Sequence, residues 1–178
     1  MNTFTIGQTK QESELAIALH QNAQIIDVRL ARSKTSADRP GIEFKEPIAA
    51  SLAVKAQNVE GPFGQLVVEV SFRLTGTRKE SASKERKAVS VECAFELTYQ
   101  LKPDFSPSSE QIRAFKDGNA IFNCWPYGRQ FIQDTIQRLG YPPLILPFLR
   151  VQTKRREDRK RMKSGRNLSN SSGVSSEE

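Results

Sequence analysis

Apolar and polar side chains alternate along four stretches of the chain. The alternation is clearest in the fourth, where every second residue from Val89 to Tyr99 belongs to the hydrophobic set. This period is typical of a β-strand that has one buried face and one face in solvent. Shorter alternating stretches lie at 24–33, after residue 48 and around 68–74. The pattern predicts a four-stranded antiparallel sheet with one polar face, which needs cover on its other face.

Turn-forming and polar residues separate these predicted strands. Pro and Gly residues within 34–47 predict a long loop, and the sequence Glu60-Gly61-Pro62 predicts a hairpin turn. The polar run at 76–86 predicts a second connection. The second and third predicted strands would therefore form a hairpin and lie next to each other in the sheet.

Helix-compatible segments precede and follow the predicted sheet. Residues 11–22 predict a short helix with Ser13 as its cap, and the segment 110–140 predicts a short helix followed by a long amphipathic one. Pro126 is suited to the first turn of the long helix, and Gly140 is suited to its end. We therefore expect an α+β fold: a four-stranded antiparallel sheet with a short N-terminal helix and C-terminal helices packed on one face.

Two segments of different composition follow the predicted helices. The segment 141–149 is apolar and contains three prolines, which favours an extended wall of a groove or a subunit interface. From Gln152 the sequence is charged and then rich in Ser, Asn and Gly, a composition typical of disorder. We expect one domain over 1–151 and a basic, disordered tail over 152–178.

The net charge of the chain comes from this tail. The chain carries 27 Lys and Arg against 20 Asp and Glu, a formal charge of +7. Residues 150–166 contain nine basic and two acidic side chains, whereas residues 1–149 carry only +2. A basic tail suits RNA, a membrane surface or an acidic protein, but without interleaved aromatic residues it is a weak signal for nucleic acid. The candidate contacts to an anionic partner are Lys154, Arg155, Arg156, Arg159, Lys160 and Arg161.

The sequence supports no enzyme class. His20 is the single histidine and has no neighbouring nucleophile or metal-ligand partner. Cys93 and Cys124 lack the spacing of a zinc site or a disulfide framework, which suits a reducing compartment. We expect no catalytic residue, no metal and no cofactor. Neither a secretory leader nor a membrane span is evident, so we expect a cytoplasmic protein.

A motif near the end of the predicted domain resembles the C-terminal motif of the SecB protein-export chaperones. It comprises Phe122-Asn-Cys-Trp-Pro-Tyr-Gly-Arg129, then the helix FIQDTIQRLG, then Tyr141-Pro-Pro-Leu-Ile-Leu-Pro147. That family shows an aromatic-Pro-Tyr-x-Arg opening, a helix ending in glycine, and an aromatic-Pro-x-Leu-x-Leu segment. The predicted strand order agrees with the same family.

The resemblance implies an ATP-independent holdase that binds unfolded, export-competent polypeptides and assembles as a homotetramer, a dimer of dimers. Apolar grooves capture many clients because burial is non-directional. The alternative for the aromatic residues of the long helix is that they pack the helix onto the sheet. The candidate residues for binding unfolded polypeptide are Phe122, Trp125, Tyr127, Tyr141, Leu144, Ile145 and Leu146.

The chain departs from the typical family members in charge. Those proteins are acidic and engage the SecA motor through acidic surfaces, whereas this chain has a nearly neutral folded part and a basic tail. The basic tail therefore argues against SecA as a partner. The N-terminal helix also resembles that of divergent SecB-like proteins, some of which protect an antitoxin. A dedicated chaperone of an antitoxin, and an adaptor that binds RNA or a membrane surface through its tail, are thus the alternatives to an export holdase.

Overall fold

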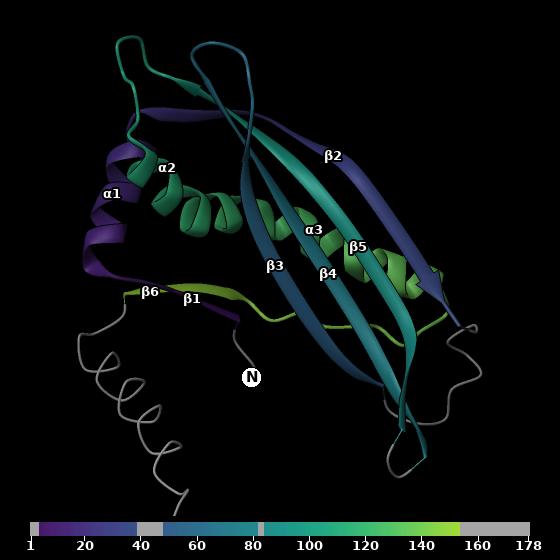
Figure 1. Ribbon diagram of the computed structural model, residues 1–178. Helices are drawn as coiled ribbons and strands as arrows, with labels where there is room; N and C mark the ends of the chain where they lie inside the picture. Colours follow the sequence, from purple (N-terminus) through teal and green to yellow (C-terminus); the bar gives the residue numbers. More distant parts are fainter. Residues whose placement is uncertain (1–3, 39–47, 82–83, 154–178) are drawn as a thin grey trace, which may run out of the picture.

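The computed structural model describes residues 4–38, 48–81 and 84–153. A four-stranded sheet is covered on one face by helices, and a two-stranded ribbon lies beside the helices (Figure 1). In chain order the elements are β1 (Phe4–Gln8), α1 (Lys10–His20), β2 (Ala23–Ala37), β3 (Ala49–Val59), β4 (Gln65–Ser81), β5 (Lys84–Leu101), α2 (Ser109–Phe115), the π-helical turn η2 (Lys116–Ala120), α3 (Ile121–Arg138) and β6 (Leu149–Thr153).

The four-stranded sheet confirms the predicted α+β fold. Its strands are antiparallel and lie in the order β2-β5-β4-β3. Alternate residues of the two central strands face the helices, as the pairs Phe72–Cys93 and Val70–Phe95 show. All four of these side chains are buried. The period-two pattern in the sequence therefore indicates that the helix-facing side of the sheet is buried.

The strands extend further than their apolar residues predict. β4 continues to Ser81 and β5 begins at Lys84, so the described residues of the polar run at 76–86 belong to two paired strands. β2 likewise continues to Ala37, inside the expected loop. Main-chain hydrogen bonds sustain a strand whose side chains are polar on both faces. Asp38 adds side-chain contacts here, because its carboxylate lies 3.1 Å from Arg78 and 2.8 Å from Arg86.

The helical layer packs closely against β4. Cys124, Gly128 and Ile132 form a buried stripe along α3. A Cβ atom built on Gly128 would lie 2.5 Å from the ring of Phe72, so the absence of a side chain brings the helix backbone against that ring. Gly140 ends the helix with φ of 77°, as its sequence position predicts.

Two expectations about helix starts are wrong. Thr9, not Ser13, caps α1: the Thr9 hydroxyl accepts from the Glu12 N–H at 3.2 Å, and the Thr9 N–H donates to the Glu12 carboxylate at 2.7 Å. Pro126 does not open a helix but lies inside α3, because the helical path is already continuous from Ser109. Packing of the buried stripe outweighs the main-chain hydrogen bond that a proline removes.

The two ends of the described chain form a parallel ribbon that the sequence pattern did not predict. β1 pairs with β6 from Phe4–Leu149 to Gln8–Thr153. The buried Gln8 side chain donates to the Ala114 carbonyl at 2.8 Å and so ties the ribbon to the helices. β6 runs two residues past the expected domain end. The six basic tail residues proposed for an anionic partner lie outside the described residues.

Candidate functional site

The proline-containing segment 141–148 is held beside the sheet without joining it. The Tyr141 hydroxyl donates to the Ala88 carbonyl at 3.2 Å, and the Gln133 side chain donates to the Leu144 carbonyl at 3.0 Å. At its other end, the Phe148 carbonyl accepts from the Phe4 N–H at 3.2 Å. Fixed backbone angles at the prolines add to these tethers. The segment therefore forms a wall whose position is set by β1, β5 and α3.

An apolar groove lies between this wall and the helix-facing side of β3 and β4. It consists of two hollows of about 700 Å³ and 230 Å³, and both are lined by Ala50, Leu74 and Leu144. The larger hollow is also lined by Phe4, Leu52, Arg129, Ile145, Leu146, Pro147, Phe148 and Arg150. The smaller hollow is also lined by Ile48, Gly76, Val89, Ile136, Tyr141, Pro142 and Pro143. We call the two together the apolar groove.

Large apolar side chains at the groove are open to solvent. Ile145 is 80% exposed and Phe148 is 62% exposed, while Leu146 between them is buried. Across the groove, β3 ends the sheet and pairs only with β4 among the described residues. The groove thus combines exposed apolar surface with an unpaired strand edge, which is the combination that an extended peptide can use.

The groove carries positive charge and no negative charge. Arg129 from α3 and Arg150 from β6 line it, and no Asp or Glu is among its described lining residues. The Arg129 guanidinium lies over the Phe148 ring, 5.1 Å from its centroid. This contact is a cation–π interaction that orders one exposed aromatic ring of the groove.

The structure divides the seven residues predicted to bind polypeptide into two groups. Tyr141, Leu144, Ile145 and Leu146 line the apolar groove. Phe122, Trp125 and Tyr127 do not line it.

The three residues from α3 have different surroundings. Trp125 is buried, stacks on Phe4 with ring centroids 5.1 Å apart, and lies 6.1 Å from the Phe72 ring. Tyr127 is half-exposed and packs near Phe95 at 6.1 Å, and Phe122 is 54% exposed. Trp125 therefore belongs to the core in the described chain.

The sequence-based set omits groove residues from distant elements. Phe4, Leu52, Leu74 and Arg129 line the groove but carried no prediction as site residues. Arg129 was visible as the last residue of the aromatic-Pro-Tyr-x-Arg motif. For Leu52 and Leu74 the only signal was strand alternation, which marks burial and not proximity to the wall.

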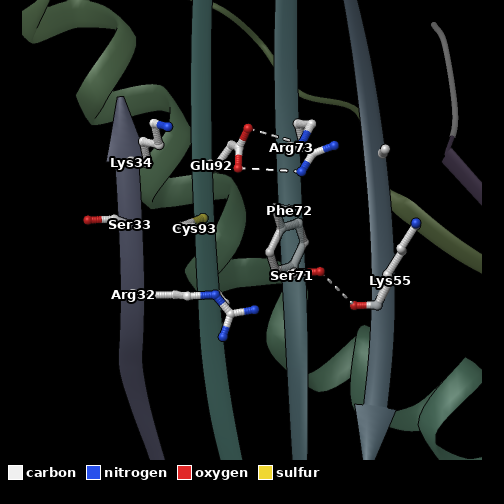
Figure 2. Close-up of a pocket in the computed structure, with 11 residues that line it drawn as sticks. Arg32, Ser33, Lys34, Lys55, Ser71, Phe72, Arg73, Glu92 and Cys93 are labelled. Atoms are coloured by element: carbon white, nitrogen blue, oxygen red, sulfur yellow. Dashed lines mark hydrogen bonds and ion pairs between the residues drawn. The ribbon is translucent and has the colours of Figure 1, made fainter. Parts of the chain in front are cut away.

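A second, polar hollow of about 310 Å³ lies on the opposite face of the sheet (Figure 2). Arg73 pairs with Glu92 across it, with 3.1 Å between Nε and Oε1. Nearby, the buried Glu69 accepts from Arg32 and from Gln57, which lie on different strands. The hydrogen bond to Glu69 raises the pKa of Arg32. These cross-strand pairs tie the four strands together on the solvent face.

The thiols in the core are poorly suited to nucleophilic chemistry. Burial raises the pKa of Cys93 to about 12 and raises that of Cys124 further. A thiol with a raised pKa carries little thiolate at neutral pH. Among the described residues, no group of three or more His, Cys, Asp or Glu is placed to hold a metal ion. No helix in the described part of the chain is both long and apolar enough to cross a membrane.

Comparison with known proteins gives structural neighbours only. No family model matches the chain, and no curated protein matches it. The SecB-like chaperone of Mycobacterium tuberculosis, solved in complex with a ChAD peptide from the HigA1 antitoxin, matches with a TM-score of 0.65 and 22% identity. The match covers 76% of this chain and 97% of that one. A protein of unknown function from Streptococcus agalactiae matches at a TM-score of 0.40 and 10% identity, over 71% of this chain and 97% of the other. The match to the M. tuberculosis chaperone shows that the chain has a SecB-like fold.

Proposed function

We propose that this protein is a molecular chaperone that binds extended segments of non-native polypeptide in the apolar groove, without nucleotide. The observation that carries the proposal is the groove itself, with Ile145 and Phe148 exposed beside the unpaired edge of β3. The SecB-like fold supports it. The activity requires no catalytic residue, and we propose that the protein is not an enzyme.

The physical chemistry of the groove favours broad selectivity. Covering apolar surface is worth about 25 cal/mol per Å² and does not depend on direction, so side chains of different shape can bind. Hydrogen bonds to a strand edge involve only the client main chain and are independent of its sequence. A groove with both properties binds many unfolded chains and rejects folded ones, whose apolar residues are buried.

The first test is suppression of aggregation. At a stoichiometric ratio to a chemically unfolded client, the purified full-length protein is expected to prevent most light scattering, with no nucleotide present. Addition of ATP should not change the result. A folded protein that leaves the scattering of several unrelated clients unchanged would contradict the proposal.

Charge substitution in the tail distinguishes the proposed chaperone from the alternative function, an adaptor that binds RNA or a membrane surface. Changing Lys154, Arg155, Arg156, Arg159, Lys160 and Arg161 to Gln leaves the apolar groove intact. We expect this variant to keep its suppression of aggregation, because the groove lies outside the tail. An RNA- or membrane-binding adaptor would instead lose salt-dependent binding to anionic polymers in the same variant.

A dedicated antitoxin client is the second candidate function. The M. tuberculosis neighbour was solved with an antitoxin peptide, and this observation favours a client of the same class. An adjacent toxin–antitoxin gene pair, and binding of that antitoxin at least tenfold tighter than binding of generic unfolded clients, would support it. If the protein binds unrelated exported precursors as tightly as it binds the antitoxin, the result would support a role in protein export, with the protein acting in the cytoplasm.

We also propose that four chains assemble as a dimer of dimers. On β2, Ile25 and Leu30 lie opposite Tyr99 and Phe95 on the helix side of the sheet, yet they are 41% and 46% exposed. Exposed apolar residues on a long edge strand favour contact with another subunit. Light scattering is expected to give the mass of four chains, about 80 kDa for chains of 20.0 kDa. A monomer at micromolar concentration would contradict this assembly.

A further inference from the structure

Arg129 is a cation without an anionic partner in the described structure. Its Nε atom is buried and has no hydrogen-bond partner among the described residues, and it takes part in no ion pair with them. Asp134, the acidic residue on the same helix, accepts from the Gln130 side chain at 2.9 Å. A buried arginine donor normally has an acceptor, because leaving it unpaired is costly. Arg129 therefore lacks the acceptor that its surroundings call for.

The place of Arg129 shows where such an acceptor could lie. Arg129 lines the larger hollow of the apolar groove, where its guanidinium covers one face of the Phe148 ring. Arg150 lines the same hollow from β6, and no carboxylate lies among the lining residues. Packing on Phe148 accounts for the position of the planar group but leaves its N–H donors unused. The Arg129 side chain is half-buried, and its terminal N–H groups, unlike the buried Nε, are accessible to an acceptor from the molecule that occupies the groove.

The guanidinium selects the kind of acceptor. Its parallel N–H groups match the two oxygens of a carboxylate, and a charge-assisted pair of this kind is stronger than a bond to a neutral carbonyl. The apolar walls reduce the competition from water. Charge complementarity thus favours a carboxylate over an amide or an amine at this point of the groove.

We propose that Arg129 binds a carboxylate of the client, so that the groove prefers apolar segments that carry an Asp or Glu residue or that end in a free C-terminus. The inference rests on the proposed polypeptide-binding function and adds a specificity-determining residue to it. Arg150 strengthens the same preference from the rim, where it is exposed. A segment with a Lys at the matching position is disfavoured by repulsion from both arginines.

The test measures peptide affinity for the full-length protein by fluorescence anisotropy. Labelled peptides share one apolar core and differ at a single position, which is Glu, Gln or Lys, with both ends blocked. The Glu peptide is expected to bind about tenfold tighter than the Gln peptide at low salt, and the Lys peptide weaker than both. Added salt should reduce the difference between Glu and Gln. A Gln peptide with a free C-terminal carboxylate, compared with its amide, shows whether the terminus serves the same role.

Substitution of Arg129 tests whether this residue causes the preference for the Glu peptide. Arg129→Met keeps a long side chain over Phe148 and removes the charge, so the ratio of Glu to Gln affinity is expected to fall from about tenfold to near one. Arg129→Lys keeps the positive charge but lacks the parallel N–H groups of the guanidinium. This variant should give an intermediate ratio of Glu to Gln affinity. Arg138→Met is the matched control, because Arg138 is exposed at the end of the same helix and does not line the groove. This control should keep the wild-type ratio.

The possible results separate this inference from the proposed function. Equal affinity of the wild-type protein for the Glu and Gln peptides overturns the role of Arg129 and leaves apolar binding intact. A Glu preference that survives in Arg129→Met overturns the assignment to this residue. If no peptide binds, both the inference and the proposed function fail. If peptide affinity falls as protein concentration rises, a second copy of the chain occupies the groove, which also overturns the inference.

Discussion

The variant Trp125→Ala is expected to be less stable than the wild-type protein by about 3–5 kcal/mol. Trp125 is 5% exposed, stacks on Phe4 of β1, and lies 6.1 Å from the Phe72 ring on β4. Removing the indole leaves a cavity where the ribbon, α3 and the sheet meet. The indole Nε1 has no hydrogen-bond partner in the described structure, and its removal offsets only a part of this loss.

Denaturant unfolding followed by circular dichroism measures the change, with Phe122→Ala as the control. Phe122 lies on the same helix, but its side chain is 54% exposed and no aromatic contact to it is seen in the described structure. Its substitution is expected to change stability by about 0.5 kcal/mol or less. A Trp125→Ala variant with wild-type stability and reduced client affinity would contradict this assignment, and would place Trp125 in the binding surface.

The double variant Ile145→Ala/Phe148→Ala is expected to weaken client binding by about 100-fold. Ile145 and Phe148 are the most exposed large hydrophobic side chains that line the apolar groove. Covering a large apolar side chain is worth about 1.5–3 kcal/mol, and a loss of 2.7 kcal/mol across the pair corresponds to about 100-fold in affinity. Because both side chains are exposed before the client binds, the stability of the free protein should change little.

Anisotropy with a labelled unfolded client measures the affinity, and the aggregation assay gives an independent readout. Phe63→Ala is the matched control, because the Phe63 side chain is fully exposed between β3 and β4 and does not line the groove. This control should bind clients as the wild-type protein does. If the double variant binds equally well, clients use another surface and the groove is not the binding site.

The sheet is the part of the structure that local sequence predicts best. Period-two alternation from Val89 to Tyr99 reflects one buried face, and those apolar residues are indeed buried in β5. The ends of the strands were not predictable in this way. Beyond Gly76 the hairpin is polar on both faces, and its strand structure depends on main-chain pairing that leaves no hydrophobic pattern.

The groove was predictable on one side only. Its wall at 141–148 follows from prolines that exclude a helix and from apolar residues without a buried face of their own. Its opposite side is made by Leu52 and Leu74, and Phe4 also lines it. These residues are distant in sequence from the wall, and β1 pairs with β6 from the opposite end of the chain. No local pattern encodes such an approach, because it depends on how α3 and the ribbon pack.

The motif in α3 shows what sequence alone determined and what tertiary structure decided. The sequence predicted a long amphipathic helix with Pro126 in its first turn, whereas α3 contains both Trp125 and Arg129, one turn apart. Which side faces the core, and which faces the groove, depends on the rotation of α3 over β4 and β5. Packing of Gly128 on Phe72 accompanies that rotation. The rotation of α3 places Trp125 in the core and places Arg129 in the groove, where no carboxylate is among the lining residues. Only tertiary structure decides this, because helix packing brings together residues that are distant in sequence.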